Sequence, residues 1–409
     1  MKRVELLAPA GDLEKLKYAI IYGADAVYIG GQVFGLRAAA KNFSFEDMKE
    51  GVAFAHARGK RVFLTLNIIP HNEDIHYLEK YIDEIKDIGL DAVILADPGT
   101  FMFVKQYAPE LEVHLSTQAN NTNFMSANFW HQQGVKRVIL ARELSFDEVA
   151  EIRSKTPMSL ELESFIHGAM CISYSGRCLM SNYMAGRDAN RGACAQPCRW
   201  EYNLVEKTRP GEYFPVEETE EGTFFFNSKD LCMIHAIPEL IKSGLDSLKI
   251  EGRMKTIYYV ASIVRAYRQA IDKFYEDPEN YVYNPEWYAE LQKVSHREFT
   301  TGFYDHKPTQ DDQLYTTSSY VRTYDFIGVV QAYDPVTKLA TIEQRNNFKV
   351  GDKIEIIGPN YFYSEQVVES MFNDKGESIN VAPHAKQIIK IPMATPVEPF
   401  YMLRMEAQE

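Results

Sequence analysis

The run Ala92-Val-Ile-Leu-Ala-Asp97 is a short apolar segment that ends in a carboxylate and leads into a stretch with helical spacing. A buried strand followed by an amphipathic helix is the unit from which parallel sheets are built. Seven more runs of this kind complete a set of eight, which predicts a closed (β/α)8 barrel of the TIM type. The seven are Val4–Ala8, Ala26–Ile29, Val62–Asn67, Glu112–Gln118, Arg137–Arg142, Leu160–Phe165 and Ser247–Arg253.

The domain organisation follows from where this pattern stops. The chain has 409 residues and 45% apolar residues, enough for one large core and a smaller one. We predict the barrel over residues 1–300, with a Cys-rich insertion at 168–200 and an extra hairpin or barrel edge at Thr223–Asn227. We predict a linker over 301–318. Short alternating runs then predict a small C-terminal β-barrel over 319–409, formed by Asp325–Ala332, Leu339–Gln344, Lys353–Ile357 and Gln387–Ile391.

The bulk composition narrows the class of protein. About 18 consecutive uncharged apolar residues occur nowhere, so we expect no membrane association and a cytoplasmic location. Only 5 cysteines in so long a chain do not form a disulfide scaffold. The net charge of −13 argues against a generally basic nucleic-acid binder, so any RNA contact must be confined to a local patch.

The cysteine-rich stretch carries the strongest chemical signal. Cys171, Cys178, Cys194 and Cys198 have the spacing Cys-x6-Cys-x15-Cys-x3-Cys directly after the seventh predicted strand. Four thiolates suit a 4Fe-4S cluster or a closed zinc site. The spacing leaves both open but favours the cluster, because structural zinc sites usually use Cys-x2-Cys pairs. Cys232 lies in an apolar run and is interpreted as a core residue.

Arginines crowd the same stretch. The stretch contains four arginines but only one acidic residue, Asp188. The excess positive charge would offset the negative charge of a thiolate-bound cluster or bind phosphate. The arginines are Arg177, Arg187, Arg191 and Arg199.

Several sequence blocks resemble those of a known family. The run Glu163-Ser-Phe-Ile-His-Gly-Ala-Met-Cys-Ile-Ser-Tyr-Ser-Gly-Arg-Cys-Leu-Met-Ser181 resembles the signature of the peptidase U32 family, the collagenase-like peptidases. The similarity extends over residues 1 to about 270, and the β tail is similar to a C-terminal domain of many members. Further matching blocks are Leu6–Gly11, Gly23–Gly30, Gly186–Gly192, Asn227–Leu231 and Lys249–Arg253.

The resemblance is nearest to the branch that hydroxylates tRNA. It implies formation of 5-hydroxyuridine at the wobble position, with prephenate as co-substrate and tRNA as partner. Related branches hydroxylate ubiquinone precursors and bind a 4Fe-4S cluster, which by position makes the four cysteines its ligands. In some of those members a later cysteine replaces the one at Cys198, so Cys232 stays an alternative ligand. A homodimer, or a heterodimer with a family paralogue, is a candidate assembly.

Polar residues toward the carboxyl ends of the predicted strands are candidate substrate ligands, because (β/α) barrels place their chemistry there. Arg142, Lys249 and Arg253 would bind a dianionic acid such as prephenate, since guanidinium groups bind carboxylates bidentately. For Arg253 the alternative is a structural salt bridge. Asn67, Gln118 and Asp97 are candidates for substrate hydrogen bonding or for capping of the adjacent loops.

The candidate catalytic residues are Glu163, His167 and Glu251. Either glutamate could move protons or could orient the neighbouring cations by pairing with them. His167 is a candidate for proton transfer, or a loop histidine with satisfied hydrogen bonds. Tyr361-Phe-Tyr363 could stack on unpaired bases or form a hairpin cluster.

Two other functions remain in view. A peptidase would need a catalytic motif, and the chain has neither His-Glu-x-x-His nor Gly-x-Ser-x-Gly. Cys171 follows His167 by four residues, but three further cysteines at ligand-like spacing make a lone nucleophile the less natural interpretation. A zinc-stabilised RNA-binding module without catalysis is the third alternative.

Overall fold

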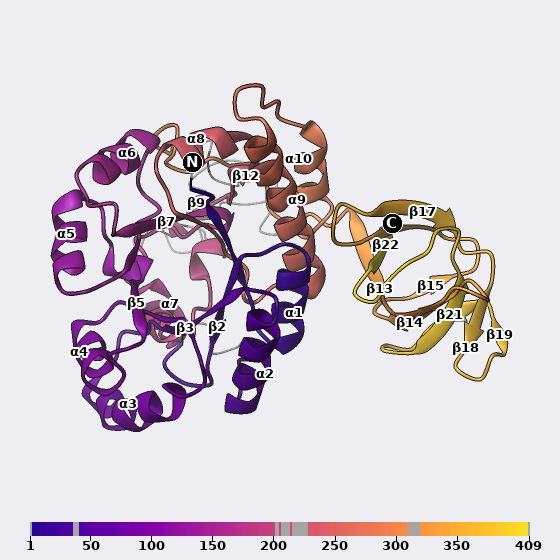
Figure 1. The fold of residues 1–409 in the computed structure, drawn as a ribbon, viewed down its shortest axis with the longest axis horizontal. Coiled ribbons are helices and arrows are strands. Elements are labelled where there is room, and N and C mark those ends of the chain that lie inside the picture. The colour runs from indigo at the N-terminus through magenta and orange to yellow at the C-terminus, as the bar shows by residue number, and fades with distance from the viewer. Residues whose placement is uncertain are drawn as a thin grey trace.

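The computed structural model describes residues 2–35, 41–200, 228–308, 312 and 320–407, together with the backbone of two short strands, β8 (Leu204–Val205) and β9 (Tyr213–Phe214). Figure 1 shows a barrel of strands ringed by helices, and beside it a smaller body built of strands. The predicted extra run at Thr223–Asn227 lies outside the described residues.

Eight parallel strands form the barrel. Their order around the sheet follows the chain, and the last strand pairs with both the first and the seventh, which closes the barrel. The predicted (β/α)8 fold is therefore confirmed. The strands are β1 (Glu5–Pro9), β2 (Ala26–Gly30), β3 (Arg61–Leu66), β4 (Ala92–Leu95), β5 (Glu112–Leu115), β6 (Arg137–Ile139), β7 (Glu161–Ala169) and β11 (Ser247–Ile250).

Helices cover the outside of the barrel (Figure 1). They are α1 (Leu13–Ile21), α2 (Phe45–His56), α3 (Asn72–Ile85), α4 (Pro98–Tyr107), α5 (Phe124–Gln132), α6 (Phe146–Ser154), α8 (Ile237–Lys242), α9 (Ile257–Glu276) and α10 (Pro285–Gln292). Several begin directly after a strand with a side-chain cap. Asp97 accepts a hydrogen bond from the Thr100 backbone N–H at 2.7 Å, which gives Asp97 the capping role. No helix in the described part of the chain is both long and apolar enough to cross a membrane.

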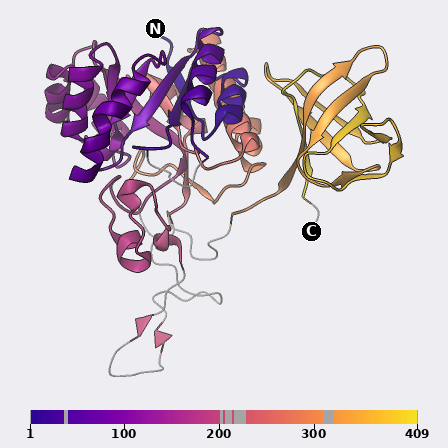
Figure 2. The same cartoon turned by 90° about the horizontal axis from the view of Figure 1, so that it is seen from below.

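The seventh strand is longer than the others and continues beyond the barrel. Its end, from His167 to Ala169, pairs antiparallel with β10 (Asp230–Cys232), which in turn pairs with β12 (Phe299–Thr300). The segment that follows β7 contains α7 (Met180–Ala185) and the short 3-10 turns η2 (Ala189–Arg191) and η3 (Pro197–Arg199). Figure 2 shows this segment projecting from one end of the barrel.

The C-terminal residues form an antiparallel β domain with its own core. The predicted runs in the tail coincide with β13, β14, β16 and β21 to within three residues at each end. The strands are β13 (Tyr324–Asp334), β14 (Leu339–Gln344), β15 (Phe348–Lys349), β16 (Lys353–Ile357), β17 (Tyr363–Val367), β18 (Met371–Asn373), β19 (Ser378–Ile379), β20 (Val381–Ala382), β21 (Ile388–Pro392) and β22 (Met402–Glu406).

The start of the predicted linker packs on the barrel. The buried Tyr304 hydroxyl donates to the Phe165 carbonyl oxygen at 2.8 Å and lies 2.7 Å from Ser164 Oγ. Most of the remaining linker, residues 309–311 and 313–318, lies outside the described residues. The linker boundaries therefore stay a prediction.

Buried charges join the two domains. Arg404 on β22 is fully buried and forms ion pairs with Glu290 on α10 and Glu355 on β16, both at 2.7 Å. Arg265 on α9 donates to the backbone carbonyls of Gly358 and Phe362. The Tyr361-Phe-Tyr363 run therefore begins at the domain contact, where the Tyr361 hydroxyl donates to Asp272 of α9.

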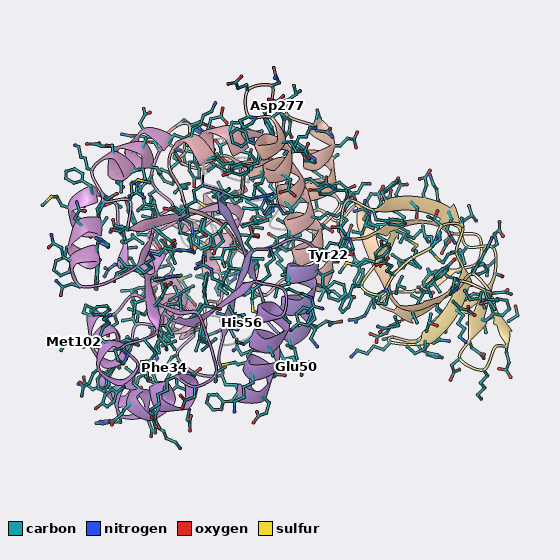
Figure 3. All side chains as sticks on the ribbon, viewed as in Figure 1. Tyr22, Phe34, Glu50, His56, Met102 and Asp277 are labelled. Atoms are coloured by element: carbon teal, nitrogen blue, oxygen red, sulfur yellow. The ribbon has the colours of Figure 1, made fainter. Side chains whose placement is uncertain are left out.

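Figure 3 shows how densely side chains fill both the barrel and the β domain. The barrel core and the helices around it form one apolar cluster, to which Val329, Ile357 and Met402 of the β domain also belong. The interface therefore contains apolar contacts as well as ion pairs.

Candidate functional site

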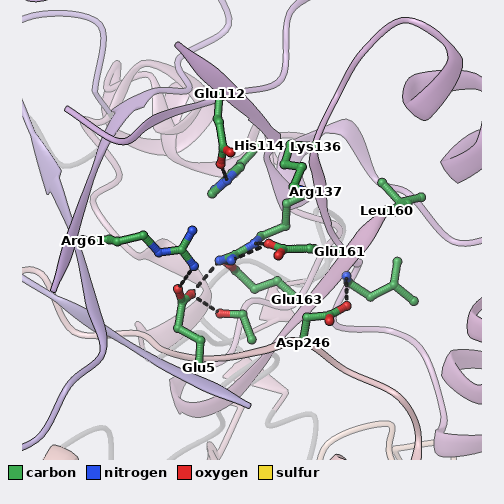
Figure 4. A network of polar contacts seen from close by, with 12 residues as sticks. Glu5, Arg61, Glu112, His114, Lys136, Arg137, Leu160, Glu161, Glu163 and Asp246 are labelled. Carbon is green, nitrogen blue, oxygen red and sulfur yellow. Dashed lines mark hydrogen bonds and ion pairs between the residues drawn. The ribbon is translucent and has the colours of Figure 1, made fainter. Parts of the chain in front are cut away.

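The amino-terminal part of the barrel interior holds a network of ion pairs (Figure 4). Arg137 on β6 is 1% exposed and donates to Glu5, Glu161 and Glu163 at 2.7–2.8 Å. Ser247 donates to Glu5 at 2.8 Å. These residues come from the first halves of their strands, and amino-terminal layers of such barrels usually serve stability.

Glu163 lies inside this network. It is fully buried, and its carboxylate accepts hydrogen bonds from Arg137 and from Lys249 Nζ, both at 2.8 Å. Burial alone would raise the pKa of Glu163, but the Lys249 and Arg137 cations outweigh it and lower the pKa. These contacts favour the pairing role of Glu163, and its catalytic role stays a prediction.

Lys249 forms the other half of the ion pair with Glu163. Its ammonium group lies 4.6 Å from the centre of the Tyr28 ring and 5.4 Å from that of Phe165. Burial lowers the pKa of Lys249, although the Glu163 carboxylate opposes that shift. Lys249 thus neutralises Glu163 and packs on aromatic faces, so its charge is already compensated within the protein.

Arg253 follows β11 at the carboxyl-terminal mouth of the barrel. It is buried, and its guanidinium donates to Thr65 Oγ1 at 3.1 Å and to Asn42 Oδ1 at 2.7 Å. These hydrogen bonds fix the orientation of the guanidinium. Two glycines make room for it. A Cβ at Gly30 would lie 1.8 Å from Arg253 Nη2, and one at Gly11 would lie 2.1 Å from the Arg253 carbonyl oxygen.

Gly30→Ala is therefore expected to lower the free energy of unfolding by about 1–3 kcal/mol, because the added methyl group displaces a packed side chain. The measurement is urea denaturation monitored by circular dichroism. Gly35→Ala is the matched comparison and should cost less, because its added Cβ would lie 3.2 Å from the nearest atom, Thr65 Oγ1, rather than 1.8 Å. Equal effects of the two substitutions would contradict the fit of Arg253 against Gly30.

Glu251 lies half-buried near Arg253. The Tyr28 hydroxyl donates to the Ile250 carbonyl oxygen at 2.9 Å and lies 3.2 Å from Glu251 Oε2. The Glu251 backbone N–H donates to the His167 carbonyl oxygen, which ties the β11 end to the β7 extension. Tyr28, on β2, thus connects Glu251 to the layer that contains Lys249.

Arg142 and Gln118 follow neighbouring strands β6 and β5. Arg142 donates from Nη1 to the Ala169 carbonyl oxygen at 2.7 Å, and its guanidinium lies 4.1 Å from the centre of the Phe165 ring. The buried Gln118 side chain lies beside Gly176 of the cysteine-bearing segment, where an added Cβ would be 3.3 Å from Gln118 Nε2. Both residues therefore lie where that segment meets the barrel.

Unpaired polar atoms collect in these two loops. Arg142 Nε and Gln118 Oε1 are buried without a hydrogen-bond partner in the described structure, as are both amide atoms of the fully buried Asn121. Such groups are rare in native proteins, and each calls for an explanation, often a ligand or an ordered water. Asn121 is not among the candidate site residues that the sequence pattern indicates. The available signal was its position in the loop after β5, three residues beyond Gln118.

Asn67 is half-buried directly after β3. Two residues later, the Ile69 N–H donates to the Asn190 carbonyl oxygen of the cysteine-bearing segment at 3.1 Å. Asn67 therefore lies beside the point where that segment touches the rim of the barrel.

His167 lies away from the mouth. Its ring packs against Tyr259 and Tyr267 of α9 and Phe299 of β12, and Nδ1 is 3.4 Å from the Tyr267 hydroxyl. Burial lowers the pKa of His167 to about 3, so the ring is neutral near pH 7. Cys171 is exposed, whereas His167 is enclosed by aromatic rings, so these contacts give no support to a Cys171–His167 nucleophile pair.

The buried histidines predict how stability depends on pH. The pKa of His114, at the barrel centre, is also lowered by burial to about 3 from an ordinary value of 6.5. Each histidine binds a proton more readily in the unfolded chain, so its contribution is complete above pH 6.5 and falls toward pH 3. Below pH 6.5 each should lower the free energy of unfolding by about 1 kcal/mol per pH unit.

His167→Gln should reduce that slope in urea titrations between pH 6.5 and 5.5. His56→Gln is the matched control, because the His56 side chain is 43% exposed and pairs with Asp91 on the surface. An unchanged slope in His167→Gln would show that the ring takes up a proton as readily in the folded protein as in the unfolded chain.

The segment that carries the four cysteines is fastened over the rim. Arg191 forms a two-pronged ion pair with Asp74 of α3, at 2.5 and 2.9 Å. Asn120, in the loop after β5, donates to the Ser175 carbonyl oxygen at 2.8 Å and accepts from Arg177 at 2.6 Å. Residues 171–198 are therefore tied to the loops after β3 and β5.

All four thiols are free, with Cys171 and Cys194 exposed and Cys178 and Cys198 half-buried. Burial raises the pKa of Cys198, Arg199 opposes this, and the thiols of Cys171, Cys194 and Cys178 raise it further. All four thiols lie on the segment between residues 171 and 198. Within the described ranges no three ligating side chains stand at coordination distances.

The donor set fits a sulfur-ligated metal group. Four thiols on one short segment supply the soft ligands that an iron–sulfur cluster or zinc takes. The Gln196 backbone N–H donates to Cys194 Sγ at 3.3 Å, and N–H donors of this kind stabilise thiolate ligands. Cys232 instead lies in the core beside Tyr267, and burial raises its pKa to about 12.

Comparisons with known proteins agree with this architecture. The model of peptidase family U32 matches residues 11–314, and that of the U32 C-terminal domain matches 322–404. The chain is 45% identical to tRNA hydroxylation protein P1 of Bacillus subtilis over 98% of this chain and 95% of that protein. It is 37% identical to tRNA hydroxylation protein P of Escherichia coli, over 99% and 97%.

A third relative is named for the modification of a different RNA. A 23S rRNA 5-hydroxycytidine synthase of Escherichia coli is 39% identical over 67% of this chain and 40% of its own length. The two family models together account for nearly all of the chain, and two relatives match it almost from end to end. The chain therefore belongs to peptidase family U32.

Proposed function

We propose that this chain hydroxylates the wobble uridine of tRNA to 5-hydroxyuridine, with prephenate as co-substrate and a 4Fe-4S cluster on Cys171, Cys178, Cys194 and Cys198. The observation that carries the proposal is the presence of four free thiols on one short segment, residues 171–198, which Arg191–Asp74 and Asn120–Ser175 contacts hold against the barrel rim. Two relatives that match this chain almost from end to end are named for tRNA hydroxylation. The proposed substrate places the protein in the cytoplasm with tRNA.

Hydroxylation of a ring carbon is an oxidation, and protein side chains other than thiols offer little redox chemistry. A cluster would mediate electron transfer, while the co-substrate would supply the hydroxyl oxygen and take up the two electrons that the ring loses. The protein's own contribution is to hold the sulfur donors near the rim, where the Arg191–Asp74 ion pair and the Asn120–Ser175 hydrogen bond fix the segment. Zinc is the alternative occupant of the same thiols.

The mouth of the barrel supports binding of an acid. The Arg253 guanidinium is oriented by hydrogen bonds to Thr65 and Asn42, and Arg142 reaches the same end of the barrel. Guanidinium groups bind carboxylates through parallel hydrogen bonds. We assign the carboxylates of the co-substrate to Arg253 and Arg142, because Lys249 is already paired with Glu163. Glu251, beside the Tyr28 hydroxyl, is the proton-transfer candidate.

The test is mass spectrometry of tRNA nucleosides from a strain that lacks the gene and any paralogue. We expect 5-hydroxyuridine derivatives to disappear, to return with the wild-type gene, and to stay absent with Arg253→Ala. Met158→Ala is the control variant that should restore them, because Met158 is 79% exposed before β7, away from the mouth. Unchanged 5-hydroxyuridine in the deletion strain would reject the proposed function.

A further inference from the structure

Large apolar side chains are exposed on the segment that carries the cysteines. Tyr183 on α7 is 89% exposed and Leu179 beside it 68%, while Tyr174 and Trp200 are 45% and 40% exposed. Soluble proteins seldom leave such side chains clustered at the surface unless that surface binds something. We call Tyr174, Tyr183, Trp200 and Tyr320 the aromatic surface.

Tyr320 connects this surface to the barrel rim. Its hydroxyl accepts a hydrogen bond from Arg199 Nη1 at 3.2 Å, one residue from Trp200. The Lys255 ammonium lies 3.8 Å from the centre of the Tyr320 ring, and Lys255 follows β11 at the mouth. The part of the aromatic surface at Trp200 and Tyr320 thus adjoins the carboxyl-terminal end of the barrel.

The charge around these rings is positive, although the whole chain carries −13. Arg177 and Arg187 are exposed, and each uses Nε for a hydrogen bond within the protein, to Asn120 and to the Ala193 carbonyl oxygen. Their remaining N–H groups are available, since a guanidinium has five donors. Asp188, the single acid in the segment, caps the Asn190 N–H.

We infer that the aromatic surface binds unpaired bases of a single-stranded RNA loop, with Arg177 and Arg187 on the flanking phosphates. Unpaired bases stack on aromatic side chains, and arginines bind the backbone. The positive rim favours RNA over a second copy of this acidic chain. The inference rests on the proposed function and names the surface that would hold the substrate loop while one base reaches the mouth.

The experiment measures binding of a short RNA stem-loop with the anticodon sequence to the full-length, metal-loaded protein by fluorescence anisotropy. Tyr183→Ala is expected to weaken binding about 5- to 100-fold, the range for loss of one base–aromatic stack. Tyr183→Phe should bind within about twofold of wild type, since the ring remains. Met158→Ala is the matched control, because Met158 is 79% exposed just before β7, at the opposite end of the barrel.

Salt dependence tests the arginines separately. Arg177→Ala and Arg187→Ala should each reduce the slope of log affinity against log salt concentration by about one. Lys80→Ala, on α3 with its side chain 81% exposed, should leave the slope unchanged.

Two results would overturn the inference and leave the proposed function intact. The first is that both Tyr183→Ala and the double variant Tyr183→Ala/Trp200→Ala bind RNA with wild-type affinity. The second is that these variants change the oligomeric state of the protein in light scattering while their RNA affinity is unchanged. In both cases tRNA from the complemented strain would still contain 5-hydroxyuridine. A wild-type protein that neither binds nor hydroxylates RNA would reject both proposals.

Discussion

Replacing Arg137 by methionine is expected to lower the free energy of unfolding by about 3–5 kcal/mol, the usual result of removing one partner from a buried ion-pair network. Three carboxylates, on Glu5, Glu161 and Glu163, would lose their shared cation inside the barrel. Chemical denaturation at pH 7 measures the effect. Such a loss is a large fraction of the stability of a typical domain.

Measuring the free energy of unfolding at acidic pH offers a second test of the stabilising role of Arg137. Burial would raise the pKa of Glu161, but Arg137 outweighs it and lowers the pKa to about 2. In Arg137→Met the carboxylates should take up protons at higher pH, so the gap to wild type should narrow from pH 7 to pH 4. Lys155→Met, which breaks the exposed pair with Glu151, is the control and should cost about 0.5 kcal/mol or less. A similar small cost for Arg137→Met would refute the stabilising role of the network.

The second large effect concerns the metal centre. Cys194→Ala is expected to reduce bound iron and sulfide at least tenfold and to abolish hydroxylation, because one of four sulfur ligands is lost. Anaerobic purification followed by visible absorption and metal analysis measures it. Cys232→Ala is the matched control and should keep both iron and activity, since Cys232 lies in the core.

The metal analysis also separates the alternatives. Stoichiometric zinc in a colourless wild-type protein would replace the cluster with a structural zinc site and favour an RNA-binding module without catalysis. Loss of iron in Cys232→Ala but not in Cys198→Ala would move the fourth ligand to Cys232.

The barrel could be predicted because each strand is a short apolar run, and the period of such runs does not depend on distant contacts. The depth at which each side chain lies within the barrel could not be predicted. Alternation places Glu163 and Lys249 on inward faces, yet it does not show that they pair with each other below the mouth. That pairing joins β7 to β11 across 86 positions of the chain.

His167 shows a second limit. The register between β7 and β11 shifts after Lys249, so Phe165 faces Lys249 but His167 faces Ile250. Strict alternation along β7 therefore fails near its end, and the ring turns to the aromatic residues of α9 and β12. A bulge of this kind leaves little trace in a single sequence.

Arg253 was predicted as an anion ligand from its place after the last strand. Its supports, Thr65, Asn42 and the space at Gly30, come from other loops and become visible only in the fold. Asn121 is harder still, because its significance lies in amide atoms that find no partner, and that is a property of three-dimensional packing.

The Arg404 guanidinium between Glu290 and Glu355 has a mechanical consequence. Separating the β domain from the barrel would break the buried ion pair between Arg404 and Glu290 and leave charges without full compensation. Because that is unfavourable, the two domains should tumble as one rigid unit in solution. The β domain would then keep a fixed distance and angle to the barrel and to its cysteine-bearing segment when a ligand binds.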